Sequence, residues 1–159
     1  MATRRLARTI VEGGRHRQSQ ADRYWANRSE RQLRYGPDGA LIAGRERMRS
    51  VMVRTRFIEA MGTVVDAWEP DEVRLRVPFA EHLTNDGKEY HGGAIAALMD
   101  TAGAAAVWAG HDYDRGLRAS TVSMTVNYTG RAQGDLVAIA RCVKRGRDTH
   151  FSEIRVEDT

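Results

Sequence analysis

One apolar stretch in the middle of the chain constrains the fold most. Residues 91–109 read HGGAIAALMDTAGAAAVWA and are apolar on nearly every side of a helix. A helix with that pattern is buried on most sides instead of lying on a surface. Asp100 interrupts the stretch, which also falls short of the roughly 20 apolar residues that cross a membrane. We therefore predict a central helix enclosed by its own domain, and no membrane partner.

On both sides of this helix the pattern changes to the period-two alternation of half-buried strands. Strand-like runs occupy 63–68, 73–77, 120–128, 136–143 and 150–156. Within 120–128 the alternation is unbroken, so neighbouring residues there are expected on opposite faces of a sheet. Strands grouped around one long helix in this order favour an α+β fold with an antiparallel sheet packed on that helix.

The charge of the chain is unevenly distributed. The first 50 residues hold 12 arginines, no lysine and five acidic residues, a net charge of +7, whereas residues 51–159 carry −3. Arginine outnumbers lysine 23 to 2 over the whole chain, which suggests a codon bias more than a function. Basic character is therefore weak support for nucleic-acid binding, and nucleic acid is not expected as a partner.

The chain divides into three parts by composition. Residues 1–44 are poor in large apolar side chains and are interpreted as a basic N-terminal appendage. Residues 45–60 show helical spacing and are predicted to form a helix leading into the domain, which spans 61–159. Within the appendage, three apolar residues fit one helical stripe: Leu6, Ile10 and Val11.

A single cysteine, Cys142, excludes an intramolecular disulfide and a Cys-rich zinc site. It falls within a predicted strand and has no evident base partner, so we interpret it as structural. This use of cysteine fits a reducing compartment, and a cytoplasmic location is expected. No cofactor and no metal site are predicted.

Asp100 is the residue of the central helix that most needs a functional explanation. A carboxylate next to Leu98 and Met99 is costly to desolvate unless it has a partner or faces a cleft. Perturbed carboxylates of this kind cluster at functional sites. An aspartate that points into water or bonds within an interface fits the pattern equally well.

The same helix begins with His91, Gly92 and Gly93. Helix N-termini present free N–H groups that bind anions or a developing oxyanion, and glycines let a ligand approach the backbone. A flexible helix start capped by histidine is the alternative. Asp100 follows His91 by nine residues, which is about 13 Å along the axis and on the opposite face. A site that uses Asp100 and Gly92 together therefore needs a second copy of the chain.

The joint spacing of these residues resembles a known family. Asn85 stands six residues before His91, Asp100 stands nine after it, and the strand STVSMTVNY and a Gly-Asp-Leu turn at 134–136 follow. Over about residues 57–156 the chain is similar to hotdog-fold acyl-CoA thioesterases of the PaaI-like, phenylacetate-pathway type. The resemblance implies a hotdog fold, in which an antiparallel sheet wraps around a long central helix. It also implies hydrolysis of an acyl-CoA or related thioester.

Roles follow from this resemblance residue by residue. Asp100 matches the catalytic carboxylate, acting as nucleophile or as general base on water, and Gly92 matches the backbone N–H that polarises the thioester carbonyl. Asn85 and His91 match polar residues that position the thioester or the attacking water. Thr121 falls where the family often has a Ser or Thr that assists this water. The resemblance further implies a homodimer, and a dimer of dimers, with antiparallel helices that bring Asp100 of one subunit to Gly92 of the other.

Substrate binding is expected at two places. Gly93 adjoins Gly92 and lets an acyl-CoA approach the helix start. Lys144, Arg145 and Arg147 form a compact basic turn that could contact the phosphates of coenzyme A, because charge-assisted bonds to phosphate favour arginine. A solvated hairpin turn is an equally good interpretation of these three residues.

The chain departs from the family where the sheet should end. Family members have a further strand after the one that ends near Val156, whereas this sequence stops at Thr159. Either the sheet is one strand short or another segment fills the gap, and the run GALIAG at 39–44 is a candidate for it.

Two other functions compete with thioester hydrolysis. A non-catalytic acyl-CoA sensor would bind ligand in the hotdog domain and DNA through the basic N-terminal arm, and it would not need Asp100. A hotdog hydratase is less favoured, because the central helix lacks a hydratase-type Asp and His pair. We expect thioester hydrolysis in preference to the sensor and the hydratase.

Overall fold

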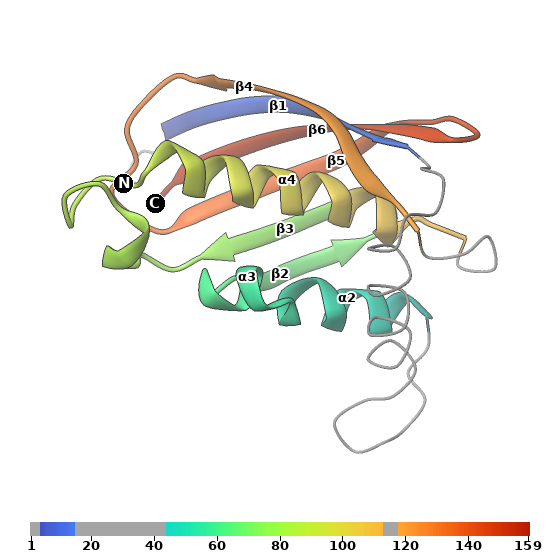
Figure 1. Cartoon of the computed structure of the whole chain (residues 1–159), viewed down its shortest axis with the longest axis horizontal. Coiled ribbons are helices and arrows are strands. Elements are labelled where there is room, and N and C mark those ends of the chain that lie inside the picture. The colour runs from blue at the N-terminus through green and yellow to red at the C-terminus, as the bar shows by residue number, and fades with distance from the viewer. Residues whose placement is uncertain (1–3, 15–43, 113–117) are drawn as a thin grey trace, which may run out of the picture.

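The computed structural model describes residues 4–14, 44–112 and 118–159, and it has the α+β architecture that the sequence predicts (Figure 1). The strands are β1 (Arg4–Gly14), β2 (Val64–Glu69), β3 (Glu72–Val77), β4 (Ser120–Tyr128), β5 (Leu136–Arg145) and β6 (Thr149–Asp158). The helices are α2 (Gly44–Arg54), α3 (Arg56–Ala60) and the central α4 (Gly92–Ala109), with a 3₁₀ turn at Glu81–Leu83.

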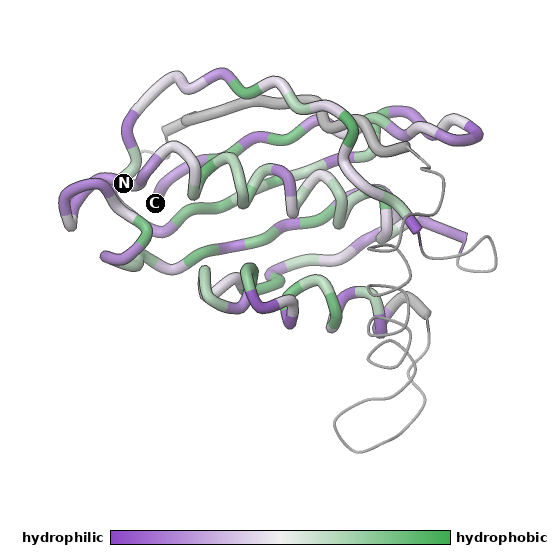
Figure 2. The backbone as a smooth tube through the Cα atoms, in the orientation of Figure 1, coloured by the Kyte–Doolittle hydropathy of each residue, from purple (hydrophilic) through white to green (hydrophobic). Residues whose placement is uncertain are grey.

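The strands form one antiparallel sheet in the order β2-β3-β5-β6-β1-β4, so β2 and β4 are its edges. Helix α4 lies across one face of this sheet and contacts every strand (Figure 1). The colours of β3, β5 and β6 alternate along each strand, which is the pattern of strands with one face on a core (Figure 2). The sheet therefore packs with one face against a single long helix.

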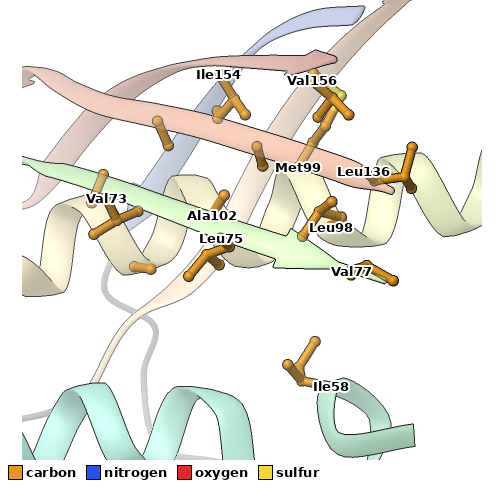
Figure 3. Packing of buried hydrophobic residues seen from close by; sticks show 14 of the residues in the cluster. Ile58, Val73, Leu75, Val77, Leu98, Met99, Ala102, Leu136, Ile154 and Val156 are labelled. Atoms are coloured by element: carbon orange, nitrogen blue, oxygen red, sulfur yellow. The ribbon is translucent and has the colours of Figure 1, made fainter. Parts of the chain in front are cut away.

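The hydrophobic core fills the space between the sheet and α4. Leu98, Met99 and Ala102 of the helix point toward Leu75 of β3 and Ile154 of β6, and all five are buried (Figure 3). Burying a large apolar side chain stabilises a fold by about 1.5–3 kcal/mol. By length and hydropathy alone α4 could cross a membrane, but 61% of that window is buried inside the fold. It is the core helix.

The helix expected over 45–60 is present but divided at Thr55. Thr55 has extended backbone angles (φ −66°, ψ 137°) and separates α2 from α3. The break changes which residues face the core: Met48 and Ile58 are buried there, whereas Phe57, which fits the uninterrupted helical period, is 64% exposed.

The N-terminal segment is a strand where the sequence pattern predicts a helical stripe. Residues 4–14 form strand β1, which lies between β6 and β4 and pairs with both, so the helical stripe expected in this part of the appendage is wrong. A helix was expected because Leu6, Ile10 and Val11 fit its period, but pairing with two neighbouring strands satisfies the backbone of a strand on both sides. The sheet therefore draws on a segment outside 61–159.

Strand β1 also fills the edge of β6 where a following strand would pair. It runs antiparallel to β6, with Arg4 opposite Asp158 and Gly14 opposite Thr149. A strand that followed β6 through a hairpin would take the same position and direction. The proposed filler at 39–44 is therefore not needed, and its residues 39–43 lie outside the described part of the chain.

Candidate active site

Asp100 and Thr121 are in direct contact. The Thr121 hydroxyl donates a hydrogen bond to the Asp100 carboxylate, with 2.6 Å between Oγ1 and Oδ1. Asp100 lies on the half-exposed side of α4 together with Ala96, Ala97 and Ala104. The carboxylate is thus held by one neighbour while it stays accessible to a substrate or a water.

A β-bulge in β4 turns Thr121 toward the helix. Thr121 pairs with Gly13 of β1, and Ser123 pairs with Glu12. Val122 between them is an extra residue that has no paired residue on β1. The face that a strand presents alternates from residue to residue, and the extra residue shifts this alternation by one position. Thr121 therefore shares a face with Met124. The expectation of an unbroken alternation in β4 is wrong at this point, and the contact with Asp100 depends on the irregularity.

The first turn of α4 leaves one N–H group without a partner in the described chain. His91 is the N-cap: its Nδ1 accepts from the Gly93 N–H at 2.9 Å, and its carbonyl accepts from the Ala94 and Ile95 N–H groups. The Gly92 N–H has no acceptor among the described residues. Since helix N-termini bind anions through such groups, Gly92 N–H is a suitable donor to a developing oxyanion.

The cap also sets the tautomer of His91. Because Nδ1 accepts a hydrogen bond, the proton of the neutral ring is on Nε2. This Nε2–H group makes no hydrogen bond within the described chain, and the side chain is exposed. His91 can therefore donate to a ligand on the same side as the helix start while its other nitrogen holds the cap.

The two glycines differ in what they tolerate. A Cβ on Gly93 would lie 2.8 Å from His91 Nδ1 and would displace the cap. A Cβ on Gly92 would meet only the Tyr128 ring, at an ordinary 3.5 Å. The His91 cap therefore depends on glycine at 93, whereas the contacts within one chain leave room for a Cβ at 92.

Asn85 is held in a short loop that ends at the helix start. Its N–H donates to the Glu89 carbonyl at 2.9 Å, and an isolated bridge pairs Thr84 with Tyr90. The Asn85 side chain is exposed and makes no hydrogen bond to Asp100 or Thr121 of the same described chain. The His91 N–H donates to the Leu83 carbonyl at 2.9 Å, so the loop that carries Asn85 is joined to the start of α4.

The Gly-Asp-Leu turn anchors this loop, a role that sequence reasoning missed. Asp135 Oδ1 accepts from the Phe79 N–H at 2.9 Å, which fixes the chain where it leaves β3. A Cβ on Gly134 would stand 1.9 Å from the Thr159 carbonyl oxygen, so only glycine fits there. The turn therefore positions the loop that carries Asn85, although it lies about 50 residues away in sequence.

The predicted basic turn lies at the other end of α4. Arg145 is paired with Asp71 and donates to the Val107 carbonyl at 2.7 Å, in the last turn of the helix. Arg147 Nε donates to Asp148, and the Lys144 ammonium lies 5.6 Å from the centre of the Phe151 ring. Within one chain these cations are far along the helix from Gly92, and Arg145 stabilises the helix C-terminus.

Cys142 has the character of a structural residue. It is half-buried in β5, and burial raises the pKa of its thiol. A raised pKa lowers the fraction of reactive thiolate at neutral pH.

The site residues predicted from the sequence fall into two groups in one chain. Asp100 contacts Thr121, whereas Gly92, His91 and Asn85 lie at or just before the start of α4. Gly92 and Asp100 are eight residues apart, which is about 12 Å along the helix axis. A thioester carbonyl that accepts a hydrogen bond from Gly92 is out of reach of Asp100 of the same chain.

This fold, an antiparallel sheet wrapped around one long helix, is the hotdog fold, and solved structures share it. The PaaI protein from the phenylacetic acid degradation operon of Escherichia coli superposes with a TM-score of 0.55 at 17% identity, over 69% of this chain and 86% of that one. A hypothetical thioesterase from Streptococcus pneumoniae, solved with coenzyme A, gives a TM-score of 0.50 at 17% identity, over 63% of this chain and 89% of that one.

Sequence comparison defines the family. The model of the thioesterase superfamily matches residues 90–159, which include the central helix and the three strands that follow it. A curated protein of Halobacterium salinarum that is named as an esterase is 37% identical over 103 residues, covering 63% of this chain and 68% of that protein. The chain belongs to the thioesterase superfamily. Hydrolysis of an acyl thioester is the general activity that this membership supports.

Proposed function

We propose that the chain is an acyl-CoA thioesterase whose active site is shared between two copies. Its observed basis is the separation of two groups of residues, here called half-sites. One holds the Asp100 carboxylate, and the other holds the Gly92 N–H, which has no acceptor among the described residues. A carboxylate and an oxyanion donor suffice for this reaction, because a thioester carbonyl is electrophilic and a thiolate leaves readily.

The reaction proceeds by attack on the thioester carbonyl carbon. As general base, Asp100 takes a proton from water while the water oxygen bonds to that carbon. Gly92 N–H stabilises the negative charge that develops on the carbonyl oxygen. The C–S bond then breaks, and the thiolate takes the proton back from Asp100, which leaves a carboxylic acid and a thiol. As nucleophile, Asp100 would instead attack the carbonyl carbon and expel the thiolate, which gives a mixed anhydride. Water then hydrolyses this anhydride, which releases the carboxylic acid, returns the Asp100 carboxylate and supplies the proton that the thiolate takes up.

Thr121 and His91 assist in this scheme. The Thr121 hydroxyl donates to Asp100, which orients the carboxylate and leaves the lone pairs of Oγ1 to accept from the attacking water. His91 Nε2–H and the Asn85 amide are available to position the thioester beside Gly92. Both side chains are exposed in one copy, as a site completed by a second copy requires.

The shape of one copy favours a twofold arrangement of antiparallel helices. The outer side of α4 around Asp100 carries alanines, which let a second helix approach closely. Strand β4 is an edge of the sheet, so its outer side is available to a neighbouring chain. With the helices antiparallel, Asp100 of each copy meets Gly92 of its partner, and the assembly has two sites.

Coenzyme A is the proposed thiol portion of the substrate. The Streptococcus pneumoniae neighbour was solved with coenzyme A, which supports this class of substrate for the fold. Lys144 and Arg147 remain the proposed contacts for its phosphates. Arg145 would contribute less, because its guanidinium is already paired with Asp71.

The test is turnover of a panel of acyl-CoA substrates, aromatic and aliphatic and short to long, by the wild type and by Asp100→Asn. We expect the variant to keep its fold and to lose nearly all turnover, because an amide is neither a base nor a nucleophile at neutral pH. Circular dichroism and the melting temperature check the fold. Unchanged turnover by Asp100→Asn would remove Asp100 from the mechanism.

A further inference from the structure

We infer that Tyr128 is a positioning residue for the Gly92 N–H, an inference that rests on the proposed role of Gly92. Tyr128 is the last residue of β4, on the edge of the sheet. Its hydroxyl donates to the Gly92 carbonyl at 2.9 Å, and its ring lies 3.5 Å from where a Cβ on Gly92 would stand. The sequence places Tyr128 on the same face as Met124 and Val126, but it does not reveal what the side chain reaches.

Tyr128 and His91 hold the same peptide group. The Gly92 carbonyl and the Gly93 N–H are the two polar ends of one planar unit. Tyr128 donates to the first, and His91 Nδ1 accepts from the second. Two side chains from different elements therefore fix the orientation of the peptide that immediately follows the Gly92 N–H.

Such a restraint matters because this helix starts with two glycines. Glycine has the greatest backbone freedom of all residues, and the ends of helices fray. An oxyanion donor is effective only when it is already oriented toward the charge that develops in the transition state. Tyr128 limits the freedom of Gly92 from the strand side while it leaves the Gly92 N–H open to the substrate.

Tyr128→Phe tests this inference, since it keeps the ring over Gly92 and removes only the hydroxyl. One neutral hydrogen bond corresponds to about a tenfold effect. We expect kcat to fall about tenfold and KM to stay within about twofold, because the transition-state oxyanion depends on the donor more than the ground-state carbonyl does. The side chain is 51% exposed, so the melting temperature should hardly change.

Ser152→Ala is the matched control. The Ser152 hydroxyl also donates to a carbonyl of α4, that of Gly103 at 2.9 Å, but it is fully buried in the core and far from Gly92. This variant should lower the melting temperature and leave kcat unchanged. Tyr128→Phe is thus expected to lower kcat and keep the melting temperature, whereas Ser152→Ala is expected to do the reverse.

Amide hydrogen exchange provides a readout that does not depend on turnover. In Tyr128→Phe the exchange of the Gly93 N–H should accelerate about tenfold, because its peptide loses one of two restraints. A fall in melting temperature with unchanged kcat and unchanged Gly93 exchange would overturn the inference. If the wild type hydrolyses no thioester, the proposed function fails, and Gly93 exchange alone decides whether Tyr128 holds the helix start.

Discussion

At the scale of single residues, the proposed site depends on backbone groups as much as on side chains. Gly92 would contribute an N–H and no side chain, and His91 uses Nδ1 to cap the helix while its Nε2–H makes no hydrogen bond within the described residues. The partners of these groups were not predictable from spacing. The HGG motif indicates an anion-binding helix start, but the tautomer of His91 follows only from the observed bond to Gly93.

Gly92→Pro tests the N–H donor with little change in structure. Proline is favoured at the first position of a helix, and His91 before it already has the extended angles that precede proline (φ −62°, ψ 133°). The substitution removes the N–H and nothing else polar. We expect kcat to fall about 100- to 1,000-fold relative to Gly92→Ala, which keeps the N–H. Equal kcat values for the two variants would exclude this donor.

At the scale of elements, the strand β4 links the two ends of the site. It runs beside α4 from Asp100, which Thr121 contacts, to Gly92, which Tyr128 contacts. Its length and position were predicted from the alternation of residues, and so was the length of α4. The bulge at Val122 was not, because a bulge depends on the partner strand β1, whose pairing the composition of residues 1–44 does not reveal.

The bulge predicts different roles for two hydroxyl residues on either side of it, Thr121 and Ser123. In an unbroken strand Thr121 and Ser123 would face the same way, but only Thr121 reaches Asp100. A hydrogen bond to a charged group is worth about 1.5–3 kcal/mol, which corresponds to about 10- to 100-fold in rate. Thr121→Val should lower kcat by that factor, and Ser123→Ala should leave it unchanged. Similar losses in both variants would contradict the bulge.

At the scale of the whole molecule, the sheet is completed by a segment from the opposite end of the sequence. The fold class and the central helix could be predicted, since both follow from periodicity, and the joint spacing of Asn85, His91 and Asp100 pointed to the hotdog family. The source of the sixth strand could not, because β1 lacks the apolar alternation of the other strands. Residues 4–14 are part of the sheet, which does not favour a free DNA-binding arm at these positions.

The shared site is the central claim, and mixing two inactive variants tests it most directly. Asp100→Asn and Gly92→Pro are co-expressed with different tags, and the mixed dimer is compared with each parent. In a mixed dimer one site combines both substitutions, and the other combines an intact Asp100 with an intact Gly92.

Turnover per mixed dimer should therefore recover to about half of the wild-type value if the two sites act independently, while each parent remains at its residual level. A mixed dimer no more active than its parents would contradict the account, because it would mean that Asp100 and Gly92 of different chains do not form one site.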